Sequence, residues 1–563
     1  MIGVLSKDTE AWAVQEFFQL FKTPWEFCVP GKHYDLVIVT REEVPQDLRA
    51  STIVVYNSRP IAFDHEFGLM TTPRRCGWVE WQGVEFPVYG DLAVFQSAGE
   101  PLVRLKQTLE VVGSMLGGAE RPTVRIGINL FLEVALLITH GQPAENARFA
   151  TLDTHISMLR AIMLNLGVPF VEVPPVPGGF DFMGCLTHDV DFVGIRDHMW
   201  DVTMWGFLYR ATVGSLLKAL AGRLLWSKCV HNWAAAFSLP LVHLGLRDDF
   251  WLEFKRYRDI ERGLGSTFFF LPFKNVAGTL DTISAPKCRA AKYDLAKIRE
   301  QVLDLVNNGS EVGLHGIDAW KDLQSAQSEQ SRIREVTGQS SMGTRMHWLY
   351  WNEGSPKTLE DAGFTYDSTF GYNDAIGFRA GTTQPFCPWG AERLLELPLN
   401  IQDSAMFYSD RMMLSEADAL NACRELIHSM SLFGGALTVN WHTRSLSPER
   451  LWGDFYGRLL KEIRAHRVWF GTAQEVVGWF RKRRALRFDS VDFDEDCVRV
   501  ALCTPDDSSE CSFTLRIHHP KFPSGESALP LSMRVREDTQ RRGEEVLEIP
   551  YGSIGPVPRA LSF

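Results

Sequence analysis

The chain has 563 residues, which is too long for one hydrophobic core, so about three domains are expected. Its hydrophobic share of 45% and charged share of 23% are ordinary for a globular protein, and its net charge of −11 argues against a nucleic-acid partner, which requires a basic face. The first residues do not resemble a secretory signal, and no run of 18 strongly apolar residues predicts a spanning helix. The ten cysteines form no C-x-x-C pair, so free thiols and a cytoplasmic location are expected.

Residues 1–120 are expected to form an N-terminal α/β domain. The segments 34–40 and 52–56 are short, β-branched and nearly uninterrupted, as in strands that are buried on both faces. Residues 10–21 have the pattern of an amphipathic helix, and residues 78–95 alternate aromatic and polar side chains as an antiparallel pair does. No Gly-x-Gly-x-x-Gly follows a strand here, so no dinucleotide site is predicted.

Residues 121–178 are expected to be a helical connector that ends in a cluster of prolines and glycines between 174 and 179. Beyond it, residues 198–246 form an unusual insertion, in which segments rich in Trp and Leu are punctuated by Arg and Lys. Two interpretations stay open. The insertion is either a set of helices packed over the main domain, or a basic amphipathic element that makes peripheral contact with an anionic membrane surface.

Residues 179–485 are expected to form the main domain, because strand and helix patterns alternate along them. Such alternation predicts a parallel sheet or barrel. Strands are expected at residues 183–186, 266–271, 312–314, 343–348, 395–399 and 436–441. In such barrels the chemistry lies at the C-terminal ends of the strands. The polar side chains at those ends are Asp189, Asp191, His315, His347, Asp403 and His442.

Residues 486–563 change in composition and are expected to form a small C-terminal β-rich domain. Short alternating strands separated by turn residues predict a β-sandwich. The expected strands are residues 491–493, 498–503, 512–518 and 531–536. Such a domain can bind polymers or other subunits, but its fold does not reveal which.

Asp189 and Asp191 lie two residues apart at the end of the first of these strands, so both side chains are expected on one face. Two like charges so close repel each other unless a cation lies beside them. One solution is a divalent metal on one carboxylate, which leaves the other as a base. The alternative is a solvated turn after a core strand, which an isolated Asp-x-Asp does not exclude.

His315 and His347 each emerge from a short strand, and with Asp191 they would make an open three-ligand site for a divalent metal. Zinc is the expected ion, with cobalt, nickel or manganese as alternatives. Such a site lowers the pKa of bound water and polarises a carbonyl, which is what hydrolysis of an amide or ester requires.

Hydrolysis also needs a base and an acid. Asp189, beside the metal, is the candidate base, and His442, after the strand at 436–441, is the candidate acid, because an imidazolium is a competent donor near pH 7. Asp403 could keep His442 charged. Either Arg345 or Arg379 could pair with Asp189 and hold it ionised, and the residues alone do not rank them.

Five segments in order resemble the motifs of polysaccharide deacetylases, the NodB-homology family that includes carbohydrate esterase family 4. They are residues 187–191 (THDVD), 266–272 (STFFFLP), 311–316 (EVGLHG), 344–348 (TRMHW) and 437–442 (LTVNWH). The resemblance covers about residues 180–480. It implies an incomplete (β/α) barrel and metal-dependent removal of N- or O-linked acetyl groups from a carbohydrate. It also implies that the first aspartate is the base and the second a metal ligand.

The chain departs from that family at the second motif, which usually carries two histidines four residues apart. Residues 316–319 offer none, and position 319 is Ala, so His347 is taken as the substitute third ligand. Two other functions stay open: a hydrolase of small amides on the same scaffold, and a degenerate deacetylase that binds glycan or acts as a scaffold. Several aromatic side chains would suit stacking on sugars or would belong to the core. They are Trp348, Trp351, Tyr372, Trp389 and Trp441.

Overall fold

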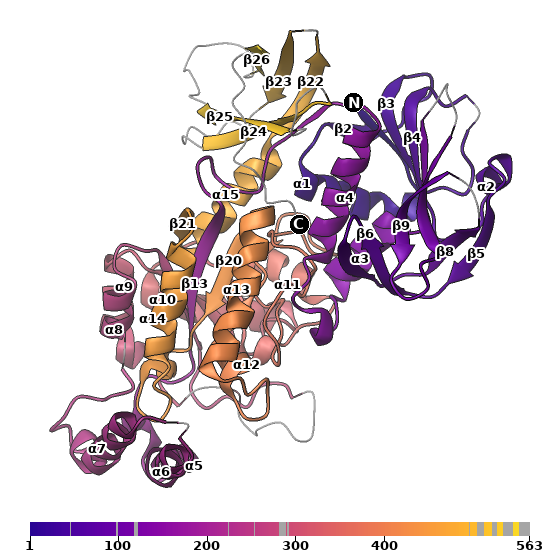
Figure 1. Ribbon diagram of the computed structural model, residues 1–563. Coiled ribbons are helices and arrows are strands. Elements are labelled where there is room, and N and C mark those ends of the chain that lie inside the picture. Colours follow the sequence, from indigo (N-terminus) through magenta and orange to yellow (C-terminus); the bar gives the residue numbers. More distant parts are fainter. Residues whose placement is uncertain are drawn as a thin grey trace.

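The computed structural model describes most of the chain and shows three regions (Figure 1). A large sheet with helices forms the N-terminal region, a parallel sheet surrounded by helices forms the centre, and small sheets form the C-terminal region. The described residues are 1–45, 47–96, 99–117, 122–222, 224–252, 254–280, 289, 292–494, 496–503, 512–520, 526–532 and 544–550.

The N-terminal region contains an 11-stranded mixed sheet among the described residues, in the order β2-β1-β3-β4-β11-β10-β9-β6-β7, with β5 and β8 beside this path. Its strands are β1 (Ile2–Leu5), β2 (Trp25–Phe27), β3 (Tyr34–Val39), β4 (Ala50–Tyr56), β5 (Met70–Arg74), β6 (Gly77–Trp81), β7 (Val84–Val88), β8 (Leu92–Gln96), β9 (Glu100–Leu105), β10 (Val111–Leu116) and β11 (Thr123–Ile126). Its helices are α1 (Ala11–Phe21), α2 (Ala62–Glu66), α3 (Leu130–Thr139) and α4 (Thr151–Asn165).

The N-terminal sheet continues past residue 120, where a helical connector was expected to begin. Strand β11 pairs in parallel with β4, and α3 and α4 bury their apolar side chains in the same core as α1. A four-residue strand such as β11 is too short to stand out from a loop in the sequence, and its pairing with β10 and with the distant β4 reveals it.

The central region is a parallel sheet in the order β18-β17-β16-β15-β14-β13-β20-β19, with β21 also paired to β13. It runs from β18 at one edge to β19 at the other, so the described strands form an incomplete (β/α) barrel. The strands are β13 (Phe182–Val190), β14 (Ser266–Phe270), β15 (Glu311–Gly316), β16 (Thr344–Met346), β17 (Tyr366–Asp367), β18 (Leu395–Glu396), β19 (Ile401–Gln402), β20 (Ala436–Asn440) and β21 (Val468–Gly471).

Helices surround this sheet, as a parallel sheet requires, because its crossover connections cover both faces. They are α8 (Phe254–Ile260), α9 (Arg299–Asn307), α10 (Leu323–Thr337), α11 (Ser355–Asp361), α12 (Asp403–Phe407), α13 (Glu416–Phe433), α14 (Gly453–Arg464) and α15 (Ala473–Ala485), with short helices η5 (Leu295–Ile298), η6 (His347–Leu349) and η7 (Thr443–Leu446). All residues of β13 and β14 are buried, which explains their nearly continuous apolar sequence.

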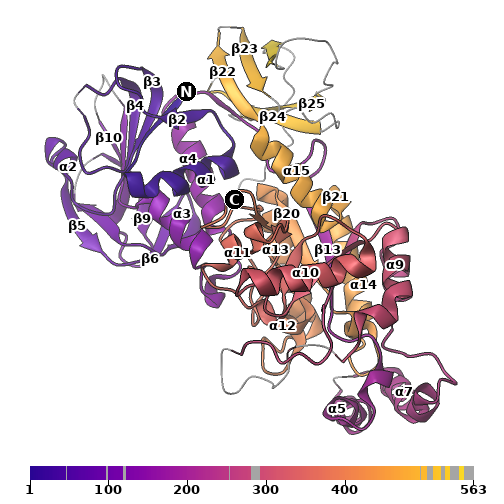
Figure 2. The same ribbon diagram turned by 180° about the vertical axis from the view of Figure 1, so that it is seen from behind.

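The insertion at 198–246 is helical and projects from the barrel at the end remote from the N-terminal and C-terminal regions (Figures 1 and 2). It contains α5 (Val202–Tyr209), the π-helical turn η4 (Arg210–Gly214), α6 (Ser215–Leu220) and α7 (Trp226–His243), and it follows the short helix η3 (Ile195–His198). We call α5, η4, α6 and α7 the helical protrusion. No helix of the described residues is both long and apolar enough to cross a bilayer.

The C-terminal region contains β22 (Arg487–Phe493), β23 (Cys497–Cys503), β24 (Ser512–His518), β25 (Glu526–Ser532) and β26 (Glu544–Pro550). They form two three-stranded sheets, β22-β23-β26 and β12-β24-β25, and the second includes β12 (Phe170–Glu172) from before the barrel. The expected β-sandwich therefore stays a prediction. Part of its last expected strand, residues 533–536, lies outside the described residues.

The regions are joined by buried charge pairs. At the end of α15, Arg484 forms an ion pair of 2.7 Å with Glu16 of α1. The neighbouring Arg483 is buried and donates to the carbonyl oxygens of Leu20 and Val173. A buried arginine that satisfies its donors on two other segments keeps these segments in a fixed arrangement.

Candidate metal centre and catalytic cluster

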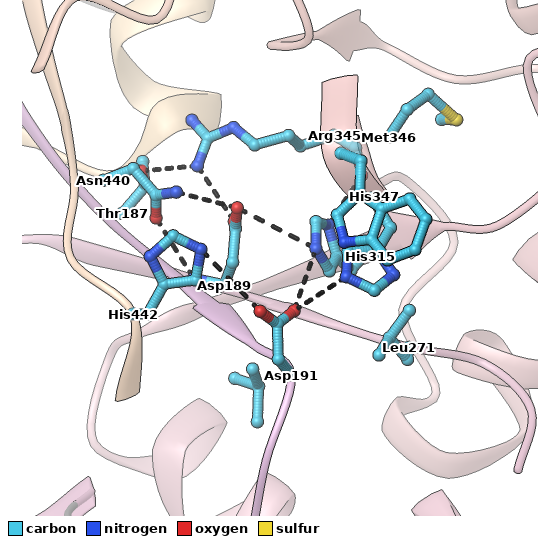
Figure 3. A network of polar contacts seen from close by, with 12 residues as sticks. Thr187, Asp189, Asp191, Leu271, His315, Arg345, Met346, His347, Asn440 and His442 are labelled. Atoms are coloured by element: carbon cyan, nitrogen blue, oxygen red, sulfur yellow. Dashed lines mark hydrogen bonds and ion pairs between the residues drawn. The ribbon is translucent and has the colours of Figure 1, made fainter. Parts of the chain in front are cut away.

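The polar residues expected at the strand ends meet at the C-terminal edge of the barrel sheet (Figure 3). Asp189 and Asp191 come from the end of β13, His315 from β15, and His442 from just after β20. His347 was expected at the end of a strand, but β16 stops at Met346 and His347 begins η6. Because the neighbouring strands are all parallel, their ends reach the same edge.

Asp191, His315 and His347 bring their ligand-type atoms within 4.8 Å of one another. Asp191 Oδ1 lies 3.3 Å from His315 Nε2 and 3.5 Å from His347 Nε2. This spacing is that of atoms that face a common point. The sequence prediction that these three residues converge is therefore met by the geometry.

The hydrogen bonds at this cluster fit a cation. His315 Nδ1 lies 2.9 Å from the carbonyl oxygen of Arg345, so Nδ1 carries a proton and Nε2 is the nitrogen that faces Asp191. Asp191 Oδ1 is buried and accepts no hydrogen bond of normal geometry, and His347 Nδ1 is likewise buried without a partner. Buried polar atoms without partners are costly, and a divalent cation would satisfy the carboxylate oxygen.

The protonation states also suit a metal site. Burial opposes the charge on Asp191, but His347, His315 and His442 outweigh it and hold the pKa of Asp191 below its usual value. Burial lowers the pKa of His347 to about 4, so its imidazole is neutral near pH 7. An ionised carboxylate and neutral imidazoles are the forms that bind a metal.

Asp189 has two partners that keep it charged and oriented. Arg345 Nη1 donates to Oδ1 at 3.0 Å, and Asn440 Nδ2 donates to Oδ2 at 2.7 Å. Burial would raise the pKa of Asp189, but His315, Arg345 and His442 together hold it below the usual value. Asp189 Oδ2 lies 3.9 Å from His315 Nε2, so this carboxylate is beside the metal-type cluster and outside it.

Of the two arginines considered as partners of Asp189, the structure places Arg345 there. Arg345 is fully buried, and its remaining donors reach Thr187 Oγ1 at 2.8 Å and two oxygens of Ser368. Arg379 instead donates to the carbonyl oxygen of Gly371 at 2.8 Å and lies over the ring of Phe370. The sequence alone did not rank the two, and the parallel pairing of β15 with β16 brings Arg345 to the side chains of β13.

His442 faces Asp191 across the site, with Nε2 3.8 Å from Asp191 Oδ2. Its Nδ1 lies 2.5 Å from Asp403 Oδ1, and its backbone N–H donates to Asp403 Oδ2 at 2.8 Å. Burial lowers the pKa of His442, but Asp403, Asp191 and Asp189 reverse this and hold it well above the usual value. His442 is therefore protonated near pH 7 in the metal-free chain, as an acid must be.

Sequence reasoning missed Asn440. Its side chain contacts Asp189 twice, as donor to Oδ2 and as acceptor from the Asp189 backbone N–H at 3.2 Å. A signal was present, since Asn440 lies two residues before His442 and residues two apart in a strand share a face. Among the aromatic candidates, Trp441 is fully buried in the core, whereas Trp348 lies beside His347 with ring centroids 5.1 Å apart.

No protein-family model matches the chain, and no curated protein matches it. The chain is similar in structure to solved polysaccharide deacetylases. A putative polysaccharide deacetylase from Mycobacterium smegmatis has 20% identity, covers 55% of this chain and 93% of its own, and gives a TM-score of 0.35. A probable polysaccharide deacetylase from Pseudomonas aeruginosa PAO1 has 14% identity, 55% and 94% coverage, and a TM-score of 0.34. PuuE allantoinase has 14% identity, 54% and 92% coverage, and a TM-score of 0.33.

Proposed function

We propose that the protein is a metal-dependent hydrolase that removes N- or O-linked acetyl groups from a carbohydrate. The observation that carries this proposal is the meeting of Asp191, His315 and His347 at one point, with Asp189 on one side and His442 on the other. A cation site flanked by an ionised carboxylate and a protonated imidazole is what acyl hydrolysis needs.

Asp191 Oδ1 and the Nε2 atoms of His315 and His347 are the atoms that would hold the cation. When bound there, a divalent metal, for which zinc is our first choice and cobalt, nickel and manganese are alternatives, would polarise the acyl carbonyl and acidify water. The carboxylate–imidazole donor set fits these ions.

Asp189 acts as the base in this proposal and accepts the proton of the attacking water. Arg345 and Asn440 keep it ionised and aimed at the site. His442 acts as the acid. Its Nε2 faces the site, and it donates a proton to the departing amine or alkoxide, while Asp403 holds Nδ1–H and stabilises the imidazolium. The base and the acid reach the reacting group from different strands, so one proton can enter as the other leaves.

The substrate class rests on the five sequence motifs at residues 187–191, 266–272, 311–316, 344–348 and 437–442, which resemble those of polysaccharide deacetylases. One structural feature agrees with it. The indole of Trp348 is only part-buried beside His347, where it offers a flat face to a sugar ring. Its backbone has φ of 63°, a left-handed conformation that a bulky residue rarely adopts, which is typical of a residue held for a function.

The test is metal analysis of the purified protein after dialysis against zinc, followed by measurement of acetate released from N-acetylated and O-acetylated sugar oligomers. We expect one bound metal per chain and release of acetate. The Asp189→Asn variant is the matched control, because it should keep the metal and lose the release. A protein that binds no metal and releases no acetate would contradict the proposal.

Two other functions for the protein are also considered, each for a specific reason. A hydrolase of small amides would use the same cluster, and it would release a product from small amides but no acetate from the oligomers. A degenerate protein that binds glycan or acts as a scaffold is favoured by the lack of a histidine in residues 316–319. It would bind acetylated oligomers without turnover, and Asp189→Asn would leave that binding unchanged.

A further inference from the structure

Exposed apolar side chains are concentrated on the helical protrusion. More than half of the large hydrophobic side chains that are exposed in the described part of the chain lie between residues 199 and 246, which make up less than a tenth of the sequence. Folded monomers rarely expose apolar groups in one continuous area, and such an area marks an interaction surface.

The exposed residues form a stripe along α5, η4 and α6. They recur at intervals of three or four, so they lie on one face of the continuous helix. They are Val202, Trp205, Tyr209, Val213, Leu217 and Leu220, of which Val202 is 87% exposed. The opposite face is buried, with Met204, Phe207 and Ala211 in a small core of their own.

Helix α7 repeats this arrangement. Trp226, Val230, Phe237 and Leu241 are exposed, and Phe237 is 76% exposed. The other face of α7 is buried against α5 and η4, through residues such as Leu239 and Val242. Both helices are therefore apolar on two faces, and the structure covers only one of them. One interpretation of the sequence was a set of helices packed over the main domain. The helices instead share a small core with one another, and this packing does not account for the second face.

The charge of the protrusion favours one kind of partner for its exposed apolar face. Residues 199–247, the protrusion with its flanking residues, contain five basic side chains and one acidic one, in a chain whose net charge is −11. Arg210 and Lys228 form ion pairs with Glu449 and Asp454 of the barrel, and an excess of two positive charges remains when these two partners are counted. The basic residues are Arg210, Lys218, Arg223, Lys228 and Arg247, and the acidic one is Asp201. Basic residues beside Trp, Tyr and Leu are the composition of helices that lie in the surface of an anionic bilayer.

We propose that the helical protrusion is a docking surface for an anionic membrane, with the exposed stripes of α5–α6 and α7 in the headgroup region. The partner that we propose is a lipid surface rather than a second copy of the chain, because the basic surfaces of two copies would repel each other. This proposal does not depend on the proposed function.

The protrusion is tied to the segment that follows His442. Glu449 forms ion pairs with Arg210 of the protrusion, at 2.7 Å, and with Arg444 of η7. Its backbone N–H donates to Asn232 Oδ1 of α7 at 2.7 Å. A docked protrusion would thus hold the catalytic edge of the barrel close to the bilayer. A consequence that does rest on the proposed function is that the substrate is a glycan presented at the membrane.

The first test is flotation of the full chain with vesicles of phosphatidylcholine alone or of an equimolar mixture of phosphatidylcholine and phosphatidylglycerol. We expect the chain to float with the mixed vesicles. A variant that combines Trp205→Gln, Val213→Gln, Leu217→Gln and Leu220→Gln should bind them at least about tenfold more weakly, because it removes apolar contact with lipid. Each of these side chains is exposed, so folding should be preserved.

The matched control changes four exposed apolar residues outside the protrusion: Val29→Gln, Met70→Gln, Leu132→Gln and Leu323→Gln. This control should float like the unaltered chain. A charge variant with Lys218→Glu and Arg247→Glu should lose about tenfold in affinity for the anionic vesicles, with no change on phosphatidylcholine alone. Metal content and acetate release from water-soluble oligomers should be unchanged in all three variants, which separates this test from that of the proposed function.

Three outcomes would overturn the proposal. The unaltered chain could fail to float with anionic vesicles, or the control variant could lose as much binding as the stripe variant. The third is a self-association measured by sedimentation that the stripe variant abolishes while vesicle binding is absent, which would assign the surface to a second copy of the chain. Circular dichroism of each variant verifies that it is folded.

Discussion

The catalytic edge of the barrel and the helical protrusion depart from the usual pattern of burial in opposite directions. At the edge, charged groups such as Asp189 and Arg345 are almost completely buried, whereas in the protrusion apolar groups such as Val202 and Phe237 are almost completely exposed. Each departure costs free energy in the isolated chain. Under our two proposals, each region is completed by something that comes from outside the chain: a cation at the edge and a membrane surface at the protrusion.

The two regions also differ in how much the chain itself compensates. Asp189 has Arg345 and Asn440, and His442 has Asp403, so most of the buried charge at the edge is paired. Asp191 Oδ1 and His347 Nδ1, at the proposed metal site, are among the buried polar atoms that lack a hydrogen-bond partner in the described part of the chain. The exposed apolar stripes of the protrusion, in contrast, are not covered by other residues that the structure describes. Substitutions at the edge should therefore have large effects on chemistry, and substitutions in the stripes should have small effects on stability.

The largest effect is expected for Asp191→Ala, which removes the only carboxylate of the three-residue metal cluster and leaves two imidazoles. Bound metal and acetate release should both be lost. Metal analysis of the purified variant checks this. Full metal occupancy in this variant would mean that Asp191 is not a ligand, and the proposed cation site at the catalytic edge would then be wrong.

Asp189→Asn should lower kcat by roughly 10²–10⁴-fold, the usual contribution of a general base, and leave metal occupancy unchanged. The amide has nearly the same shape but cannot take the proton. Steady-state kinetics with a parallel metal assay separates the two effects. An active variant would remove Asp189 from the role of base.

His347→Ala should weaken metal binding by roughly 10²–10⁴-fold, because the roughly 10–16 kcal/mol with which proteins hold zinc would be shared among three ligands. Titration with a competing chelator measures this affinity. Trp348→Leu is the matched control, since Trp348 contacts His347 without offering a ligand atom. If His347→Ala binds metal as the control does, the third ligand lies elsewhere.

Asp403→Asn should change the pH dependence of kcat. Asp403 is the strongest influence that raises the pKa of His442, and the acid form of His442 is lost as pH rises through that pKa. Without the Asp403 charge the pKa falls, so activity should decline at a lower pH than in the unaltered chain. A kcat–pH profile at saturating metal shows this limb. An unchanged limb would assign the acid to another group.

The smallest effect is expected for Phe237→Ser on the exposed side of α7. Its free energy of unfolding should stay within about 0.5 kcal/mol of that of the unaltered chain. Leu239→Ala, two residues along on the buried side, should cost about 2–5 kcal/mol. Urea unfolding of the two variants makes the comparison. Equal losses would show that Phe237 is covered within the chain and that the protrusion has no free apolar face.

Much of the barrel could be read from local patterns. Residues such as Phe268–Phe270 form an apolar run that is typical of a strand buried on both faces, and the alternation of such runs with helices predicts parallel pairing. The candidate ligands followed from the same reasoning, since residues that end parallel strands must share an edge. The local pattern did not predict β11, which is very short, and it placed the end of β16 too late, since that strand ends at Met346.

Local sequence therefore established which residue types end the strands and that residues 198–246 combine Trp and Leu with Arg and Lys, because these properties depend on the composition and spacing of one segment. The fold alone decided that Arg345 rather than Arg379 pairs with Asp189, that Asn440 joins them, and that only one apolar face of each protrusion helix is covered. Those outcomes depend on which distant segments become neighbours. Which segments become neighbours depends on the packing of the whole chain, so it cannot be predicted from the sequence of one segment.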